Sequence, residues 1–309
     1  MPYFGDLCHE PKSLKSRRLP TKLPMVEPSR KKNKKAKNKK GNYSGNHQRG
    51  WLWGHHAVTE TLMTGKWPVN EIYANQKAFD QFSHLLRDKQ AAGIPLEIVD
   101  NARLEQLSRS SEHQGLVVRL GGFPYQTLES FTQLLGQALA AHADDAANSP
   151  QSATPPPLVV ICDRLQDTFN FGAILRCCDG ASVVGVIVGD HSQAEVTPHV
   201  ARSSSGAVNH IPIVKVSDLL ATAQFVKEQG VQLVAADSNT ETSAWNSQLG
   251  GATALVIGSE ATGIQPDLLA ICDQRVCIPM QGKVTSLNAA VAAGILLYEI
   301  RRQQAVPLG

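Results

Sequence analysis

Long apolar runs are absent from this sequence of 309 residues. A membrane-spanning helix needs about 20 predominantly apolar residues in a row, and no stretch reaches that length, so we expect no membrane partner. The N-terminus also lacks the continuous apolar segment of a secretory signal, and the early acidic residues Asp6 and Glu10 are not typical of a transit peptide. We therefore expect a cytoplasmic protein.

Several common cofactor and metal motifs are missing as well. No G-x-G-x-x-G follows a strand pattern, which argues against a nicotinamide dehydrogenase, and no P-loop is present. No cysteine pair has C-x-x-C spacing and no histidine cluster has metal-ligand spacing, so we expect neither a metal site nor a disulfide framework. Most of the cysteines lie in apolar runs and are expected to be buried free thiols. The six are Cys8, Cys162, Cys177, Cys178, Cys272 and Cys277.

Positive charge is concentrated at the N-terminus. Residues 1–50 contain 14 Lys and Arg but only 3 Asp and Glu, a net charge of +11, whereas the remaining residues carry a net charge of −8. The stretch RKKNKKAKNKKGNYSGNHQRG has no hydrophobic face, so we expect 1–49 to be a disordered tail that binds a polyphosphate without reading sequence. A tail that only improves solubility is the alternative.

Residues 50–121 alternate short strand and helix patterns, which is typical of a small α/β domain. We expect a turn at WLWG, a helix over 56–64, a strand over 70–73 and one helix in AFDQFSHLLRDKQAAGI. The strands PLEIVD and GLVVRL flank a short helix that Asn101 is expected to cap.

A linker is expected over 122–156. It contains one helix, TLESFTQLLGQALAAHA, followed by the Pro- and Ala-rich segment DDAANSPQSATPPP, which we interpret as a flexible or extended connector.

The segment 157–309 predicts a larger α/β domain. Helices are expected over 171–180, 218–229 and 266–271, with a closing helix from Ser286 to about Arg302. Strands that are apolar throughout are typical of parallel sheets covered on both faces, and ligands of such sheets bind beyond the carboxyl ends of the strands. The expected strands are LVVICD, VVGVIVG, HIPIVKV, VQLVAAD, ATALVIG and RVCIPM.

Three polar loops follow strands of this sheet. In the first, DRLQDTFNFGAILRCCDGA, Asn170 can cap a helix, Gly172 allows close backbone approach, and Arg176 lies on the first turns. A plain capped helix with a surface arginine is the alternative.

In the second loop, ALVIGSEATGI, the missing side chain of Gly258 would let a flat ligand lie against the backbone, and Glu260 can neutralise a cation. The alternative is a simple strand-to-turn transition, with Glu260 placed where a helix macrodipole favours it.

The third loop is IPMQGKVTSLNAAVAAGI. Ser286 is a good N-cap candidate. This leaves Asn288 inside the first helical turn, where asparagine is an indifferent helix former, so we interpret it as a group held for a polar ligand. A tolerated surface asparagine is the alternative.

Together the three loops resemble the three motifs of the SpoU family of RNA ribose 2′-O-methyltransferases, in the SPOUT superfamily. The first motif is Asn170-Phe-Gly172-Ala-Ile-Leu-Arg176, the second is LVIGSEATGI and the third is IPMQGKVTSLNAAVAAGI, and TPHVARSSSGAVNHIPI is also similar. Residues 51–121, headed by GHHAVTETL, resemble the L30e-like substrate-binding domain that precedes many members. The departures are Thr168-Phe169 near a common proline, Ala261 at a frequent glycine and Ala289-Ala290 for Val-Ser. None of them removes a proposed functional side chain.

The resemblance implies a trefoil-knotted α/β domain over 157–309, S-adenosylmethionine held in the knot, and a homodimer with its sites near the interface. The reaction it implies is in-line transfer of the sulfonium methyl group to a ribose 2′-hydroxyl, for which positioning is decisive. It implies no metal. The implied cofactor-binding residues are Gly258, Ile278, Met280 and Leu287, and the implied catalytic residues are Arg176, Asn170, Glu260, Ser286 and Asn288.

The role of Arg176 stays open at this point. In the family the matching arginine is implicated in activating the hydroxyl, but arginine is normally protonated and a poor base. It can instead hold the neighbouring phosphate or stabilise the developing alkoxide.

We expect the substrate to be ribosomal RNA, most simply a guanosine of 23S rRNA, because tRNA-modifying relatives often lack the front domain. A tRNA substrate is the alternative within the same chemistry. A catalytically silent RNA-binding or ribosome-assembly factor of the same fold is the alternative outside it.

Overall fold

The structure is a computed structural model and describes residues 50–148 and 154–305. The expected basic tail, 1–49, lies outside the described residues, as does part of the expected connector, 149–153.

The N-terminal part of the described chain forms a four-stranded mixed sheet, in the order β1-β4-β2-β3. β4 (Leu116–Leu120) pairs antiparallel with β1 (Trp51–Trp53) and with β2 (Val69–Ala74), and β2 pairs parallel with β3 (Leu96–Ile98). The prediction of a turn at residues 51–53 was wrong, because all three residues are buried in β1. Their partner strand lies more than sixty residues away, so no local pattern announces the pairing.

Four helices accompany this sheet: α1 (His55–Thr64), α2 (Gln76–Gln81), α3 (Ser83–Ala91) and α4 (Asn101–Ser108). The single helix predicted after β2 is two helices, because Phe82 adopts φ −112° and ψ 24° and breaks the helical path. The predicted cap of α4 was also wrong. Asp100 is the N-cap, and its side chain accepts a hydrogen bond from the Arg103 N–H at 2.8 Å.

The second sheet has six strands in the order β10-β8-β9-β5-β6-β7, and every neighbouring pair is parallel. This confirms the predicted α/β class with a mostly parallel sheet. The strands are β5 (Leu158–Asp163), β6 (Gly185–Gly189), β7 (Ile213–Val216), β8 (Gln232–Ala236), β9 (Thr253–Gly258) and β10 (Gln274–Val276).

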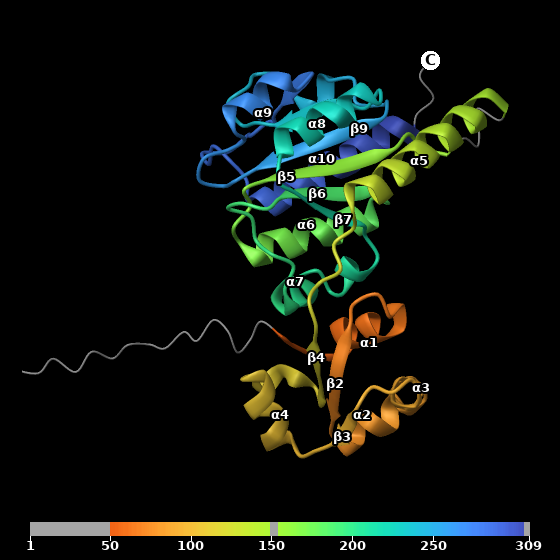
Figure 1. The fold of residues 1–309 in the computed structure, drawn as a ribbon. Helices are drawn as coiled ribbons and strands as arrows, with labels where there is room; N and C mark the ends of the chain where they lie inside the picture. Colours follow the sequence, from red (N-terminus) through yellow and green to blue (C-terminus); the bar gives the residue numbers. More distant parts are fainter. Residues whose placement is uncertain (1–49, 149–153, 306–309) are drawn as a thin grey trace, which may run out of the picture. The chain divides into compact units, whose positions relative to one another are not determined.

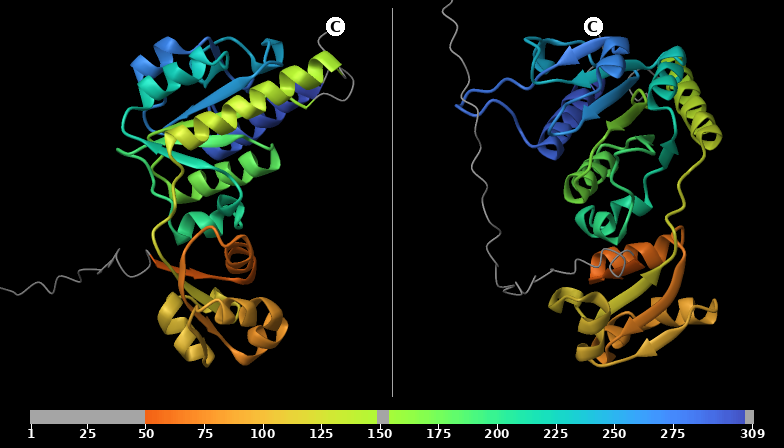
Figure 2. Two further views of the ribbon diagram at one scale, coloured as in Figure 1. Left: turned by 45° about the vertical axis from the view of Figure 1, so that its right-hand side comes forward. Right: turned by 60° about the vertical axis from the view of Figure 1, so that its left-hand side comes forward.

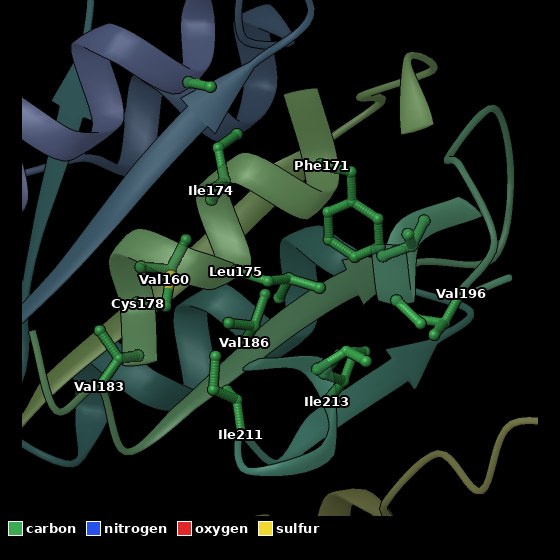
Figure 3. Close-up of a cluster of buried hydrophobic side chains, with 14 of the residues drawn as sticks. Val160, Phe171, Ile174, Leu175, Cys178, Val183, Val186, Val196, Ile211 and Ile213 are labelled. Atoms are coloured by element: carbon green, nitrogen blue, oxygen red, sulfur yellow. The ribbon is translucent and has the colours of Figure 1, made fainter. Parts of the chain in front are cut away.

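Helices cover both faces of this sheet (Figures 1 and 2). Alternate residues of β5 point to opposite sides: Val160 packs with α6 (Thr168–Gly180) and α10 (Ala289–Ala305), whereas Val159 packs with the helices on the other face. Figure 3 shows the first of these layers, in which Phe171, Ile174 and Leu175 of α6 lie against the sheet. A strand flanked in this way is expected to be apolar on both sides, as β5 is from Leu158 to Cys162.

The other face carries α5 (Leu128–Asn148), α8 (Leu219–Glu228) and α9 (Pro266–Ile271). The helix expected in the linker is therefore a layer of the parallel sheet. Phe131 of α5 is fully buried, and a Cβ at Gly185 of β6 would lie 2.8 Å from the Phe131 ring, so the strand needs glycine there. Residues 144–148, predicted to be connector, continue this helix.

Four short elements complete the described chain: α7 (Pro198–Ser203) and the 3-10 turns η2 (Ser111–His113), η3 (Ala207–Asn209) and η4 (Ala244–Asn246).

No helix in the described residues is both long and apolar enough to cross a membrane.

Candidate active site

A large hollow lies at the carboxyl edge of the parallel sheet, where ligands of this fold class bind. Its volume is about 1020 Å³, and it is lined by the ends of β8, β9 and β10 and by the loops that follow them. These loops begin at Asp237, Ser259 and Cys277. The second and third polar loops of the sequence therefore meet at one site.

All four residues predicted to hold a cofactor line this hollow: Gly258, Ile278, Met280 and Leu287. Met280 and Leu287 each leave 36% of their surface exposed although they are large and apolar. Two apolar side chains in contact with solvent beside a hollow offer surface that a flat, apolar group can cover.

Gly258 is required by the turn that follows it. A Cβ at this position would lie 2.3 Å from both the Gly263 carbonyl carbon and the Ile264 nitrogen. The turn closes through two hydrogen bonds, Gly263 N–H to the Ser259 carbonyl at 2.8 Å and the reverse bond at 3.2 Å. The space left by the missing side chain is filled by this turn, so the turn itself requires glycine. That a flat ligand lies against the Gly258 backbone stays a prediction.

The buried carboxylate of Asp163 stabilises the turn that follows Gly258. Asp163, at the end of β5, is 1% exposed and accepts a hydrogen bond from the Gln265 N–H at 2.7 Å. Arg164 donates to both Asp163 oxygens, at 3.1 and 3.3 Å, and also to the Gly263 carbonyl at 3.4 Å. The start of the first polar loop thus holds the second in place.

The first polar loop is capped differently from the prediction. Asp167 is the N-cap of α6, and its side chain accepts from the N–H groups of Phe169 and Asn170 at 2.7 and 3.0 Å. Asn170 lies one turn inside the helix, so capping does not use its side chain. The amide is free to bind groups from other loops.

Asn170 joins all three polar loops. Its Nδ2 donates to Glu260 Oε1 at 2.5 Å, and its Oδ1 accepts from Asn288 Nδ2 at 2.9 Å. These partners lie 90 and 118 residues further along the chain. An amide supplies one donor and one acceptor in a fixed plane, so it can orient a carboxylate and a second amide together.

Asn288 is the N-cap of the closing helix, which corrects the prediction that Ser286 caps it. Asn288 Oδ1 accepts from the N–H groups of Ala290 and Val291, at 2.9 and 3.3 Å, and α10 begins at Ala289. The same side chain therefore caps a helix with its oxygen and binds Asn170 with its nitrogen. Asn288, which was interpreted from the sequence as a group held for a polar ligand, is thus both a helix cap and a link to the first polar loop.

Ser286 and Arg176 are less engaged. Ser286 is exposed and lines the hollow beside Glu260. Arg176 is exposed on α6 and does not line the hollow, and no hydrogen bond or ion pair ties it to another residue of the described chain. Within one chain, the structure brings together Asn170, Glu260 and Asn288 but leaves Arg176 apart.

Asp237 and Arg275 line the hollow and were not predicted. The guanidinium of Arg275 donates to Asp237 Oδ2 from Nε at 2.9 Å and from Nη2 at 2.5 Å. Burial acts to raise the pKa of Asp237, but the Asn239 N–H and the Arg275 guanidinium outweigh it and hold that pKa below its usual value. The signal was present in the sequence, since Asp237-Ser238-Asn239 follows the apolar strand VQLVAA as the other polar loops follow theirs.

The five described cysteines are free thiols, but fewer of them are buried than predicted. Cys162 and Cys178 are fully buried, and burial raises the pKa of Cys162 to about 12. Cys177, Cys272 and Cys277 are half-buried. In the part of the chain that the structure describes, no three His, Cys, Asp or Glu side chains are grouped as metal ligands.

Comparison with known proteins follows the division into two sheets. The SpoU rRNA Methylase family matches residues 157–298, and a family described as RNA 2′-O ribose methyltransferase substrate binding matches residues 51–126. YacO of Bacillus subtilis (strain 168), named as a TrmH family tRNA/rRNA methyltransferase, is 30% identical over 259 residues, which cover 84% of this chain and 98% of YacO. A Staphylococcus aureus (strain MSSA476) protein of the same family name is 31% identical over 81% of this chain and 95% of its own length.

Solved structures agree with this. The crystal structure of an RNA 2′-O ribose methyltransferase has a TM-score of 0.62 and 26% identity and covers 84% of this chain and 90% of its own. The SpoU methyltransferase AviRb from Streptomyces viridochromogenes, in complex with the cofactor AdoMet, has the same fold, with a TM-score of 0.63 and 24% identity over 85% of this chain and 94% of that one. Since a relative of 30% identity spans most of both chains and the two family matches fall on the two sheets, this chain belongs to the SpoU/TrmH family of RNA methyltransferases.

Proposed function

We propose that this protein transfers the methyl group of S-adenosylmethionine to a ribose 2′-hydroxyl of RNA, with ribosomal RNA as the substrate. The observation that carries the proposal is the bridge made by Asn170 between Glu260 and Asn288 at the rim of the hollow. Three polar groups from three distant loops meet there in a fixed arrangement, as a site that orients a reactant requires.

The hollow fits the cofactor. Its volume of about 1020 Å³ is at the upper end of small-molecule sites. Ile278, Met280 and Leu287 would cover the adenine, and the backbone of the turn after Gly258 would bound one side of the site. S-adenosylmethionine supplies an electrophilic methyl group on a sulfonium.

The residues of the chain supply position and charge. Glu260 is exposed on one side of Asn170, where its carboxylate can attract the cationic reactant or accept a hydrogen bond from the ribose. Ser286 and Asn288 lie on the loop opposite and can hold the sugar hydroxyls. Holding two reactants in line removes several kcal/mol from a barrier, and effective molarities reach about 10⁵–10⁸ M.

Arg176 is proposed to act at the site in a homodimer. Val291 and Tyr298 on α10 and Phe169 on α6 are exposed apolar side chains of the kind that an interface covers. A second copy that packs on α6 and α10 would cover them and would place a cation, Arg176, beside the site. Because arginine stays protonated, we assign it to the RNA phosphate or the developing alkoxide and not to proton removal.

We retain the rest of the predicted organisation as part of the proposal. It comprises an L30e-like RNA-binding domain over 50–121, a trefoil-knotted methyltransferase domain over 157–309, to whose sheet α5 of the expected linker 122–156 adds a layer, and a cytoplasmic location. Family membership supports it, and the substrate-binding family falls on the first sheet. The net charge of +11 over 1–50 supports RNA as the partner.

The test is a map of ribose methylation in rRNA and tRNA from cells with and without the gene. We expect loss of one 2′-O-methyl group, at a guanosine of 23S rRNA, its full return with the wild-type gene and only a partial return with an Asn170→Ala variant. Loss at a tRNA position would keep the chemistry and change the substrate. An unchanged map in both RNA classes would contradict the enzyme and favour a silent RNA-binding factor.

A further inference from the structure

A second hollow lies at one edge of the N-terminal sheet. Its volume is about 440 Å³, within the range of small-molecule sites. The hollow forms where β1 and β2 end and β4 begins. The Gly54 N–H, just after β1, donates to the Leu116 carbonyl at 3.3 Å, and the Asn75 N–H, just after β2, donates to the Gly115 carbonyl at 2.9 Å. Three loops therefore meet around one opening.

The Gln114 side chain is fixed in this hollow. Its Oε1 accepts from the His55 N–H at 2.7 Å, and its backbone carbonyl accepts from His55 Nε2 at 2.6 Å. Gln114 itself has a φ of +55°, and the buried His113 ring accepts from the next N–H, that of Gly115, at 2.9 Å. With its oxygen engaged, the Gln114 amide offers N–H donors that no described residue accepts from.

A second amide is oriented in the same way. Asn75 caps α2 through its Oδ1, which accepts from the Ala78 N–H at 2.8 Å, and its Nδ2 donates to Asn101 Oδ1 at 2.8 Å. Asn101 therefore turns its own N–H₂ away from Asn75, and among the described residues this group too has no acceptor. The position opposite Asn75 must be glycine, since a Cβ at Gly115 would lie 2.5 Å from Asn75 Oδ1.

A carboxylate completes the lining. Glu105 follows Asn101 by four residues on α4, so the two side chains lie one above the other on one face of that helix. No hydrogen bond or ion pair engages the Glu105 carboxylate within the part of the chain that is described. Lys77 also lines the hollow and supplies a positive charge.

We infer that this hollow binds one unpaired guanine base of the RNA substrate. Proteins read single-stranded RNA by hydrogen bonds to the Watson–Crick edges of splayed bases. Guanine alone presents two adjacent donors, N1–H and N2–H₂, beside an acceptor, O6. The two oxygens of Glu105 match the donors, the amide N–H groups of Asn101 and Gln114 match O6, and Lys77 is placed for a phosphate.

The inference rests on the proposed function in that it takes RNA as the substrate, but it concerns a base that is held and not methylated. It goes beyond the assignment of residues 51–126 to substrate binding, because it names the edge of the sheet, the side chains and the base.

The test measures binding of the full-length protein to short single-stranded oligouridylates by fluorescence anisotropy. The probes contain one central guanosine, inosine or adenosine, or uridine throughout. A bidentate pair is worth about 1–3 kcal/mol of base discrimination, so we expect the guanosine probe to bind about tenfold more tightly than the adenosine probe. Inosine, which lacks the exocyclic amino group, should fall between them.

Variants assign the preference to the hollow. Glu105→Gln should reduce the guanosine preference to less than about threefold, since a neutral amide no longer accepts two hydrogen bonds from one base edge. Glu129→Gln, an exposed carboxylate at the start of α5, is the matched control and should keep the wild-type preference. Circular dichroism checks that each variant is folded, and Asn101→Ala replaces Glu105→Gln if the latter is not.

Two results would overturn the inference: equal binding of the guanosine and adenosine probes by the wild type, or a preference that survives in Glu105→Gln. Either result leaves methyl transfer untouched. Conversely, a protein that prefers guanosine but transfers no methyl group to RNA would refute the proposed function and keep the guanine site.

Discussion

Replacing Gly258 by alanine tests whether the turn at the end of β9 builds the cofactor site. The new Cβ would lie 2.3 Å from two backbone atoms, Gly263 C and Ile264 N. Since carbon atoms rest at about 3.5–4.0 Å from their neighbours, the turn must move by about 1 Å. Neither backbone atom can rotate away as a side chain would.

The magnitude follows from what that movement breaks. The Gln265 N–H lies 2.7 Å from the buried Asp163 carboxylate, and a hydrogen bond to a charged group is worth about 1.5–3 kcal/mol. Steric strain from a methyl group in a packed site adds about 1–3 kcal/mol. At about 2–4 °C per kcal/mol, the melting temperature should fall by about 10 °C.

Thermal unfolding and titration calorimetry with S-adenosylmethionine measure the two consequences. We expect Gly258→Ala to melt about 10 °C lower and to bind the cofactor at least about tenfold more weakly, because the turn and Glu260 are displaced. Gly251→Ala is the matched control, since a Cβ there meets nothing within 4 Å. Wild-type melting and affinity in Gly258→Ala would refute the reasoning about this turn.

Three further predictions concern single side chains. Asn170→Ala should lower kcat by about 10- to 100-fold with little change in cofactor affinity, because it removes positioning and not binding surface; an unchanged kcat would remove Asn170 from the site. Arg176→Ala should bind S-adenosylmethionine as the wild type does but lose transfer to RNA, and retained turnover would exclude the proposed role. Iodoacetamide at about pH 8 should leave Cys162 unmodified in the folded protein and modify it in guanidinium, because alkylation needs the thiolate and burial raises the pKa of Cys162 to about 12. Mass spectrometry of peptides measures the modification. Alkylated Cys162 in the folded protein would contradict the prediction and show that β5 opens readily.

The parallel sheet and the place of the site could be predicted from the sequence. Strands such as LVVICD and ATALVIG are apolar at almost every position, which is typical of a sheet covered on both faces. Polar loops that follow such strands must converge at the carboxyl edge, and Glu260 and Asn288 do meet Asn170 there.

Helix starts could not be predicted to the residue. Asp167 and Asn170 lie three positions apart, and Ser286 and Asn288 two apart, and all four are good capping residues. The backbone path decides between them, and that path is set by packing of α6 and α10 against the sheet. The hydrogen bonds of the Asn170 side chain to other loops could therefore not be predicted without knowing that Asp167 is the N-cap of α6.

Non-local pairing accounts for the other differences. Trp51–Trp53 form a strand because residues 117–119 pair with them, and α5 belongs to the parallel sheet because Phe131 packs on Gly185. Neither contact has a signal within a local window of sequence. Asp237 follows an apolar strand, which is a local signal, but its partner Arg275 lies 38 residues further along the chain in β10, and no local pattern indicates that pairing.

The most direct measurement of the central claim is transfer of a tritiated methyl group from S-adenosylmethionine to rRNA, followed by alkaline hydrolysis. Alkali cleaves RNA through the free 2′-hydroxyl, so a methylated ribose protects the phosphodiester bond that follows it. We predict that the label appears in alkali-resistant dinucleotides with the wild-type protein and that its initial rate of appearance falls by about 10- to 100-fold with Asn170→Ala. Label recovered only in mononucleotides would place the methyl group on a base and contradict the account.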